Sequence, residues 1–197
     1  MTSPLSPDAA GILNTIIRSR RTVKPEFFTG EDVPRPVLEQ LLENATWAPT
    51  HKKTEPWLFK VFQQKALERL GNYLADHYRA HTPADKFSAV KEQQNREKPL
   101  RCAAVIAICM RPPAADLPEW EEIAAVACAV ENLWLSMTAY GLSGYWSSPA
   151  AMTEGAEFLE LQPGERCLGI FYLGHAPVQD TVRRRAPLAE KVKWVTE

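Results

Sequence analysis

The sequence has little glycine and no glycine-rich phosphate loop. Only 9 of its 197 residues are glycine. Neither the G-x-G-x-x-G pattern of a dinucleotide-binding βαβ unit nor the G-x-x-x-x-G-K-[ST] pattern of a P-loop occurs. The sequence therefore gives no indication of a Rossmann-type or P-loop nucleotide site.

The chain also lacks an excess of charge and a long apolar run. Lys and Arg number 23 against 24 Asp and Glu, so no overall charge favours nucleic acid or an anionic membrane as a partner. The apolar run at 123–130 ends at Glu131, far short of the roughly 20 residues that span a bilayer. The N-terminus lacks the pattern of a secretory signal, which favours a cytoplasmic location.

Metal-binding and disulfide patterns are missing too. The four cysteines form no C-x-x-C pair and stand among apolar residues, so we interpret them as reduced core side chains rather than a disulfide framework or a zinc site. His77 and His81 share a helix face, but Tyr78 stands where a zinc protease has Glu, which favours a structural or surface pair. The cysteines are Cys102, Cys109, Cys128 and Cys167.

What is present indicates a globular protein, which we expect to be one domain over 1–197, with a core at 12–177 and a tail at 178–197. Apolar, β-rich segments predict strands near 57–62, 103–110, 144–148 and 167–174. Helical periodicity predicts helices starting near Asp8 and Pro34, and at 65–80, 119–140 and 153–161. The charged stretch around 82–99 is expected to be a mobile helix or lid on the substrate side. The 119–140 helix is apolar on nearly every side, which favours burial within the domain and, in part, against a second subunit.

Four short signatures in a fixed order resemble the nitroreductase family over about 12–177. The first is R-R-T at 20–22, at the end of the first helix, and the second is A-P-T-H at 48–51 leading to E-P-W at 55–57. The third is G-L-S-G-Y-W-S at 141–147, after the long apolar helix. The fourth is G-I-F-Y-L-G-H-A-P at 169–177. Each alone is weak, but their order and spacing together are typical of that family.

The resemblance implies an α+β fold with a central, mostly antiparallel sheet surrounded by helices, in a homodimer with an FMN site at its interface. Arg suits a phosphate because its planar guanidinium donates two parallel hydrogen bonds. The family pattern therefore assigns the FMN phosphate and ring edge to the two arginines with the threonine hydroxyl. The other implied residues flank or contact the flavin, in part across the dimer. The implied cofactor-binding residues are Arg20, Arg21, Thr22, Trp47, His51, Trp146, Ser147 and Ser148.

Plainer interpretations stay open for these residues. The arginines also suit a solvated helix end, His51 an ordinary loop, and Trp47 and Trp146 the core. Lys24 is a further candidate near the flavin. Glu55 and Lys53 replace the family's common Gln and Asn, so neither is given a ligand role. The cluster at 183–185 is interpreted as a solvated basic tail, although such residues reach the phosphate in some relatives.

The implied activity is a ping-pong transfer of hydride from NAD(P)H, through FMN, to an electron-poor acceptor such as a nitroaromatic, quinone or enone. No side-chain nucleophile or acid–base pair is required, so no catalytic residue is named. Three alternatives remain: other flavin chemistry such as dehalogenation or ring dehydrogenation, a non-catalytic FMN-binding protein, and an interaction protein without a cofactor.

Overall fold

A four-stranded antiparallel sheet lies at the centre of the computed structural model, which describes residues 8–113, 116–177 and 184–197. The strands are β1 (Trp57–Phe62), β2 (Ala104–Met110), β3 (Ser143–Ser147) and β4 (Arg166–Gly174), in the order β1-β2-β4-β3. All three neighbouring pairs are antiparallel. The predicted α+β fold with an antiparallel sheet is confirmed, and each predicted strand lies within one residue of its observed bounds.

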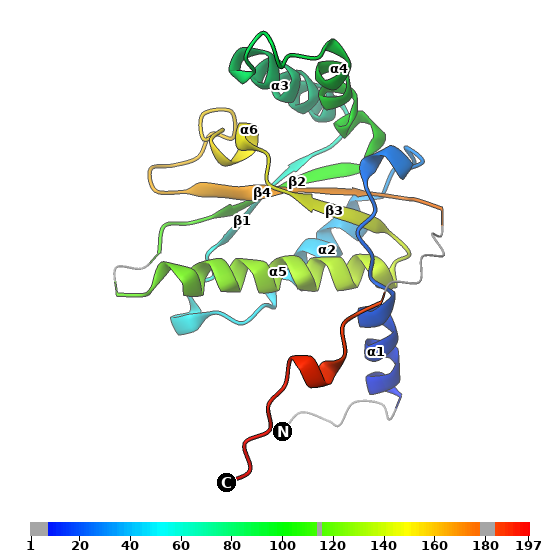
Figure 1. The fold of residues 1–197 in the computed structure, drawn as a ribbon, viewed down its shortest axis with the longest axis vertical. Coiled ribbons are helices and arrows are strands. Elements are labelled where there is room, and N and C mark those ends of the chain that lie inside the picture. The colour runs from blue at the N-terminus through cyan, green and yellow to red at the C-terminus, as the bar shows by residue number, and fades with distance from the viewer. Residues whose placement is uncertain (1–7, 114–115, 178–183) are drawn as a thin grey trace.

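Helices cover both faces of the sheet (Figure 1). On one face lie α2 (Arg35–Thr46) and α5 (Glu119–Ala139); on the other lie α3 (Lys65–His81), α4 (Ala89–Glu97) and the short α6 (Ala150–Thr153). The helix α1 (Ala9–Ser19) and the C-terminal segment project away beside α5. None of the described helices is long and apolar enough to cross a membrane.

Successive side chains of the central strands point to opposite faces of the sheet, which produces two hydrophobic cores. Ile106, Ile108 and Met110 of β2 face α2 and α5, whereas Val105 and Ala107 face α3 and α6. This period of two is what a pleated strand buried on both faces requires. Every residue of β2 is buried, as expected for a central strand with a continuous apolar sequence.

Two sequence predictions are wrong. No helix continues over the predicted range 153–161. Instead, α6 ends at Thr153, because the hydroxyl of Tyr73 donates to the Ala151 carbonyl at 2.8 Å, the acceptor that a continuing helix would offer to residue 155. Cys128 is exposed on α5 rather than in the core, whereas the other three cysteines are buried. The division into one core domain and a tail stays a prediction. Residues 178–183, which include Arg183 of the predicted basic cluster, lie outside the described residues.

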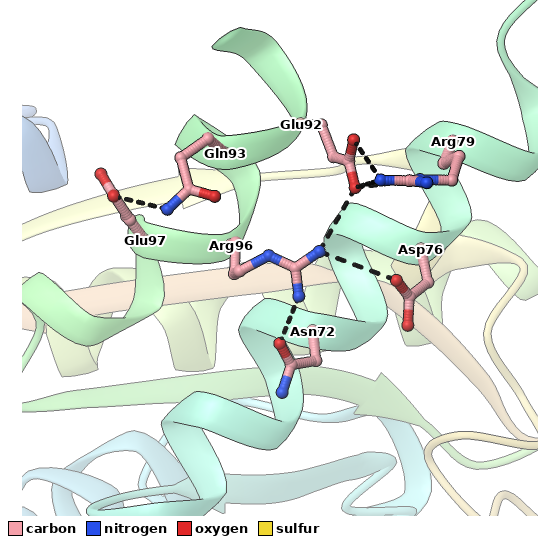
Figure 2. A network of polar contacts seen from close by, with 7 residues as sticks. All are labelled: Asn72, Asp76, Arg79, Glu92, Gln93, Arg96 and Glu97. Atoms are coloured by element: carbon pink, nitrogen blue, oxygen red, sulfur yellow. Dashed lines mark hydrogen bonds and ion pairs between the residues drawn. The ribbon is translucent and has the colours of Figure 1, made fainter. Parts of the chain in front are cut away.

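The charged stretch around 82–99 contains α4, which is docked on α3 by a buried carboxylate (Figure 2). Glu92 is 5% exposed and accepts hydrogen bonds from Arg79 at 2.7 and 2.9 Å and from Arg96 at 3.3 Å. Arg96 also donates to Asn72 at 2.6 Å. Gly71 lets the helices approach, because a Cβ there would lie 2.2 Å from the Arg96 carbonyl oxygen.

We predict that Glu92→Ala loosens α4, because two arginines lose their shared carboxylate. Since both arginines reach solvent, the loss of unfolding free energy should be about 1–2 kcal/mol, below the range for fully buried pairs. Urea denaturation measures the loss, and hydrogen exchange over 89–97 locates it. Glu97→Ala, which removes only an exposed contact with Gln93, is the matched control. Equal effects of the two substitutions would contradict the assignment.

Candidate functional site

Three arginines at the end of α1 line one cavity of about 660 Å³ with an arginine from the C-terminal segment. The four are Arg18, Arg20, Arg21 and Arg185. Arg20 is the most constrained: its Nε lies 3.8 Å from Glu131 Oε1, and its guanidinium lies over the Trp134 ring, 4.4 Å from the centroid. The cavity therefore collects positive charge around a single partly compensating carboxylate, as an anionic group requires.

Arg21 has a second task at the helix end. Its Nη1 donates to the carbonyl oxygens of Arg18 at 2.6 Å and Arg20 at 3.0 Å. Carbonyls at a helix C-terminus have no partner within the helix, so this contact satisfies them. Arg21 thus helps to end α1, and Arg20 is the arginine that packs against α5.

The chain after the arginines is fixed to the edge of the sheet. Thr22 forms a parallel bridge with Gly144, and the Val23 amide donates to the Gly144 carbonyl at 3.0 Å. Gly144 must lack a side chain because a Cβ would lie 2.4 Å from the Phe171 ring. The arginine cavity therefore lies beside the start of β3.

The other end of β3 carries the remaining predicted flavin contacts. Trp146, Ser147 and Ser148 line a cavity of about 230 Å³ with Leu168. The buried Nε1 of Trp146 has no hydrogen-bond partner among the described residues. Buried donors are normally paired, so this one is suited to a bound polar acceptor.

Trp47 and His51 lie elsewhere, at the junction of α2 and β1. Trp47 is 78% exposed, so the core interpretation is wrong for it, and its Nε1 donates to Glu43 at 3.3 Å. His51 Nδ1 lies 2.5 Å from Glu121 Oε2, at the N-terminus of α5. In contrast to Trp47, Trp146 packs against the core on the α5 side.

The loop after His51 is strained and is held by α5 and the turn before it. Lys52, Lys53 and Glu55 have positive φ angles, which cost free energy in non-glycine residues. Two contacts anchor the loop in addition to that of His51: Lys52 pairs with Asp116, and Thr54 donates to the buried Glu122 at 3.0 Å. A strained conformation held in this way is typical of functional loops.

Within one chain these groups remain apart. The loop at His51 adjoins β1, whereas the arginines adjoin β3. These two strands form the opposite edges of the sheet, three strand spacings or about 14 Å apart. Along α5, the contact with His51 at Glu121 and the contact with Arg20 at Glu131 are about 15 Å apart. The structure therefore brings together Arg20, Arg21 and Thr22 at one end of β3 and Trp146, Ser147 and Ser148 at the other, but not Trp47 and His51.

Sequence reasoning assigned no site role to Arg18, Arg185 or Trp134. Arg18 precedes the R-R-T signature. Arg185 was interpreted as part of a solvated tail, and although its side chain is exposed, it lines the arginine cavity. Trp134, whose ring lies under the Arg20 guanidinium, is in the middle of an apolar helix, and no motif around it in the sequence indicates a site residue. Lys24 pairs with Glu26 at 3.9 Å and does not line the arginine cavity.

Comparisons with known proteins agree with this architecture. The family model described as "Nitroreductase family" matches residues 17–175. YfhC of Bacillus subtilis strain 168, named as an NAD(P)H nitroreductase, is 28% identical over 185 residues, 91% of this chain and 92% of that protein. YdjA of Escherichia coli K12, named in the same way, is 30% identical over 148 residues, 72% of this chain and 78% of that protein.

Solved structures share the fold over nearly the whole chain. A nitroreductase-like family protein from Bacillus cereus superposes with a TM-score of 0.78 at 25% identity, covering 99% of this chain and 98% of that one. The FMN-dependent nitroreductase NfnB of Mycobacterium smegmatis, solved with NADPH, has a TM-score of 0.77 at 19% identity, covering 96% and 100%, and shows the common fold. The family model matches most of this chain, and YdjA is 30% identical over 72% of it. This chain therefore belongs to the nitroreductase family.

Proposed function

We propose that this protein is an FMN-dependent oxidoreductase that passes hydride from NAD(P)H to a small electron-poor organic acceptor such as a nitroaromatic or a quinone. The observation that carries the proposal is the arginine cavity at one end of β3, with an unpaired buried donor, Trp146 Nε1, at the other. Family membership and the names of the relatives support the same activity.

The residues present fit FMN. Arg20 and Arg185 would bind the phosphate with charge-assisted hydrogen bonds, and Arg18 and Arg21 add to the positive field. Trp146 Nε1 would donate to a polar atom of the flavin, with Ser147 and Ser148 beside it. When bound, FMN supplies the redox centre, taking hydride from NAD(P)H and passing it to an acceptor that then occupies the same place.

We propose that a second subunit completes each site. Trp47 and His51 adjoin β1, at the opposite edge of the sheet from β3, and line neither the arginine cavity nor the Trp146 cavity. Apolar side chains are exposed on α5 and on the elements that project beside it. Such exposed apolar patches mark protein interfaces. They are Ile12, Leu13 and Ile17 of α1, Trp120 and Ile123 of α5, and Trp194 and Val195 near the C-terminus.

The activity predicts a specific optical change. The purified protein, loaded with FMN, should show flavin absorbance bands that bleach on anaerobic addition of NADPH or NADH and return when a nitroaromatic or quinone is added. Stopped-flow absorbance measures both half-reactions. Flavin binding without bleaching would indicate a non-catalytic flavoprotein, and a protein that cannot be loaded with FMN would contradict the proposal.

Removing the proposed phosphate ligands should weaken FMN binding. Arg20→Gln and Arg185→Gln each delete a charge-assisted donor, which should raise the Kd for FMN by about 10- to 100-fold. Quenching of flavin fluorescence measures the Kd. Arg35→Gln is the control, because that side chain pairs only with Glu39 on the exposed face of α2. An unchanged Kd in both cavity variants would place the phosphate elsewhere.

A further inference from the structure

A separate cavity of about 370 Å³ lies between α3, α4 and the turn after β3. Its charged and titratable lining is basic or phenolic: His77, Tyr78 and His81 come from α3, Lys91 and Lys98 from α4 and its C-cap, and Tyr172 from β4. None of the described residues that line it is Asp or Glu. The site is therefore suited to an anion.

The two lysines are positioned by α4. Lys91 and Lys98 are seven residues apart, two helical turns, and so share one face of the chain at α4. Glu92 and Arg96, which dock α4 on α3 (Figure 2), lie on a neighbouring face of the helix. The docking network thus holds both ammonium groups over the cavity.

Neither lysine has an anionic partner in the described parts of the chain. Lys91 Nζ lies 5.1 Å from the centroid of the Tyr78 ring, and Lys98 Nζ lies 5.9 Å from that of Tyr172. Both lysines also line an adjoining cavity with two acidic side chains, which have other partners. Glu26 pairs with Lys24 at 3.9 Å, and Glu97 accepts from Gln93 at 2.7 Å. Both ammonium groups remain available to a ligand.

Tyr172 supplies an independent observation. Its side chain lines the cavity and the residue is 2% exposed, yet its hydroxyl has no hydrogen-bond partner among the described residues. Burial raises the pKa of Tyr172 far above its usual range, so the hydroxyl stays protonated and can donate. A hydroxyl that lines a cavity without a protein partner is free to donate to a bound acceptor.

The cavity adjoins the proposed flavin site, because Ser147 lines both. We propose that this cavity binds a small aromatic carboxylate, held by the Lys98 ammonium and the Tyr172 hydroxyl, with Leu74, Ala150 and Ala151 contacting its ring. The volume lies within the range of small-molecule pockets. Resting on the proposed function, this inference identifies aromatic acids that carry a reducible group, such as a nitro group, as the class of acceptor that is presented to the flavin.

The test compares benzoate with its neutral analogue benzamide by isothermal titration calorimetry on the FMN-loaded protein. We expect benzoate to bind at least tenfold more tightly, and added salt to weaken benzoate alone. Lys98→Met should remove the preference, and Tyr172→Phe should weaken benzoate binding about fivefold. Lys65→Met, at the start of α3 and away from the cavity, should leave binding unchanged.

Equal binding of benzoate and benzamide, or an unchanged preference in Lys98→Met, would overturn the inference. Lys98→Arg, which keeps the charge, should retain the preference and guards against a folding defect in Lys98→Met. The two proposals fail separately. A flavin that bleaches with NAD(P)H in a protein that does not prefer benzoate overturns only this inference, whereas selective benzoate binding without bleaching upholds the pocket and contradicts the proposed activity.

Discussion

The hydrogen bonding of β4 to β2 on one side and to β3 on the other determines where the candidate site residues lie. Gly169 makes the second pairing possible: it has a φ of 134°, and a Cβ there would lie 2.5 Å from the Ser147 carbonyl oxygen. β3 is therefore the edge strand beside β4. The bridge between Thr22 and Gly144 places the end of α1 next to β3. The arginine cavity and the Trp146 cavity are therefore the two ends of one strand.

Helix α5 links this edge to the rest of the molecule. Near its N-terminus, Glu121 and Glu122 hold the strained loop at His51; further along, Glu131 and Trp134 hold Arg20. Both groups are thus attached to one rigid element but separated by about 15 Å of helix. This separation is the reason for the proposal that a second copy of the chain completes each site.

Much of the fold was predictable because period-two and period-3.6 patterns are local. The strands and the long helices follow from them, and the four signatures identified the family. The failures involve contacts between distant residues. Tyr73 ends α6 from a helix 78 positions earlier, and the exposure of Cys128 depends on which side of an apolar helix meets the sheet. Arg185 reaches the arginine cavity only because the C-terminal segment returns to α1. The individual roles of the site residues remain predictions.

The most direct test of a site completed between subunits is FMN binding by a purified hybrid dimer. One chain carries Arg20→Gln and Arg185→Gln, and the other carries Trp47→Ala and His51→Ala, with different affinity tags. If the two sets meet across the dimer, one site of the hybrid carries every substitution and the other carries none. The account predicts one FMN per hybrid dimer with native affinity, although each parent homodimer binds weakly. A hybrid that binds as weakly as both parents would show that each chain builds its site alone and would contradict the account.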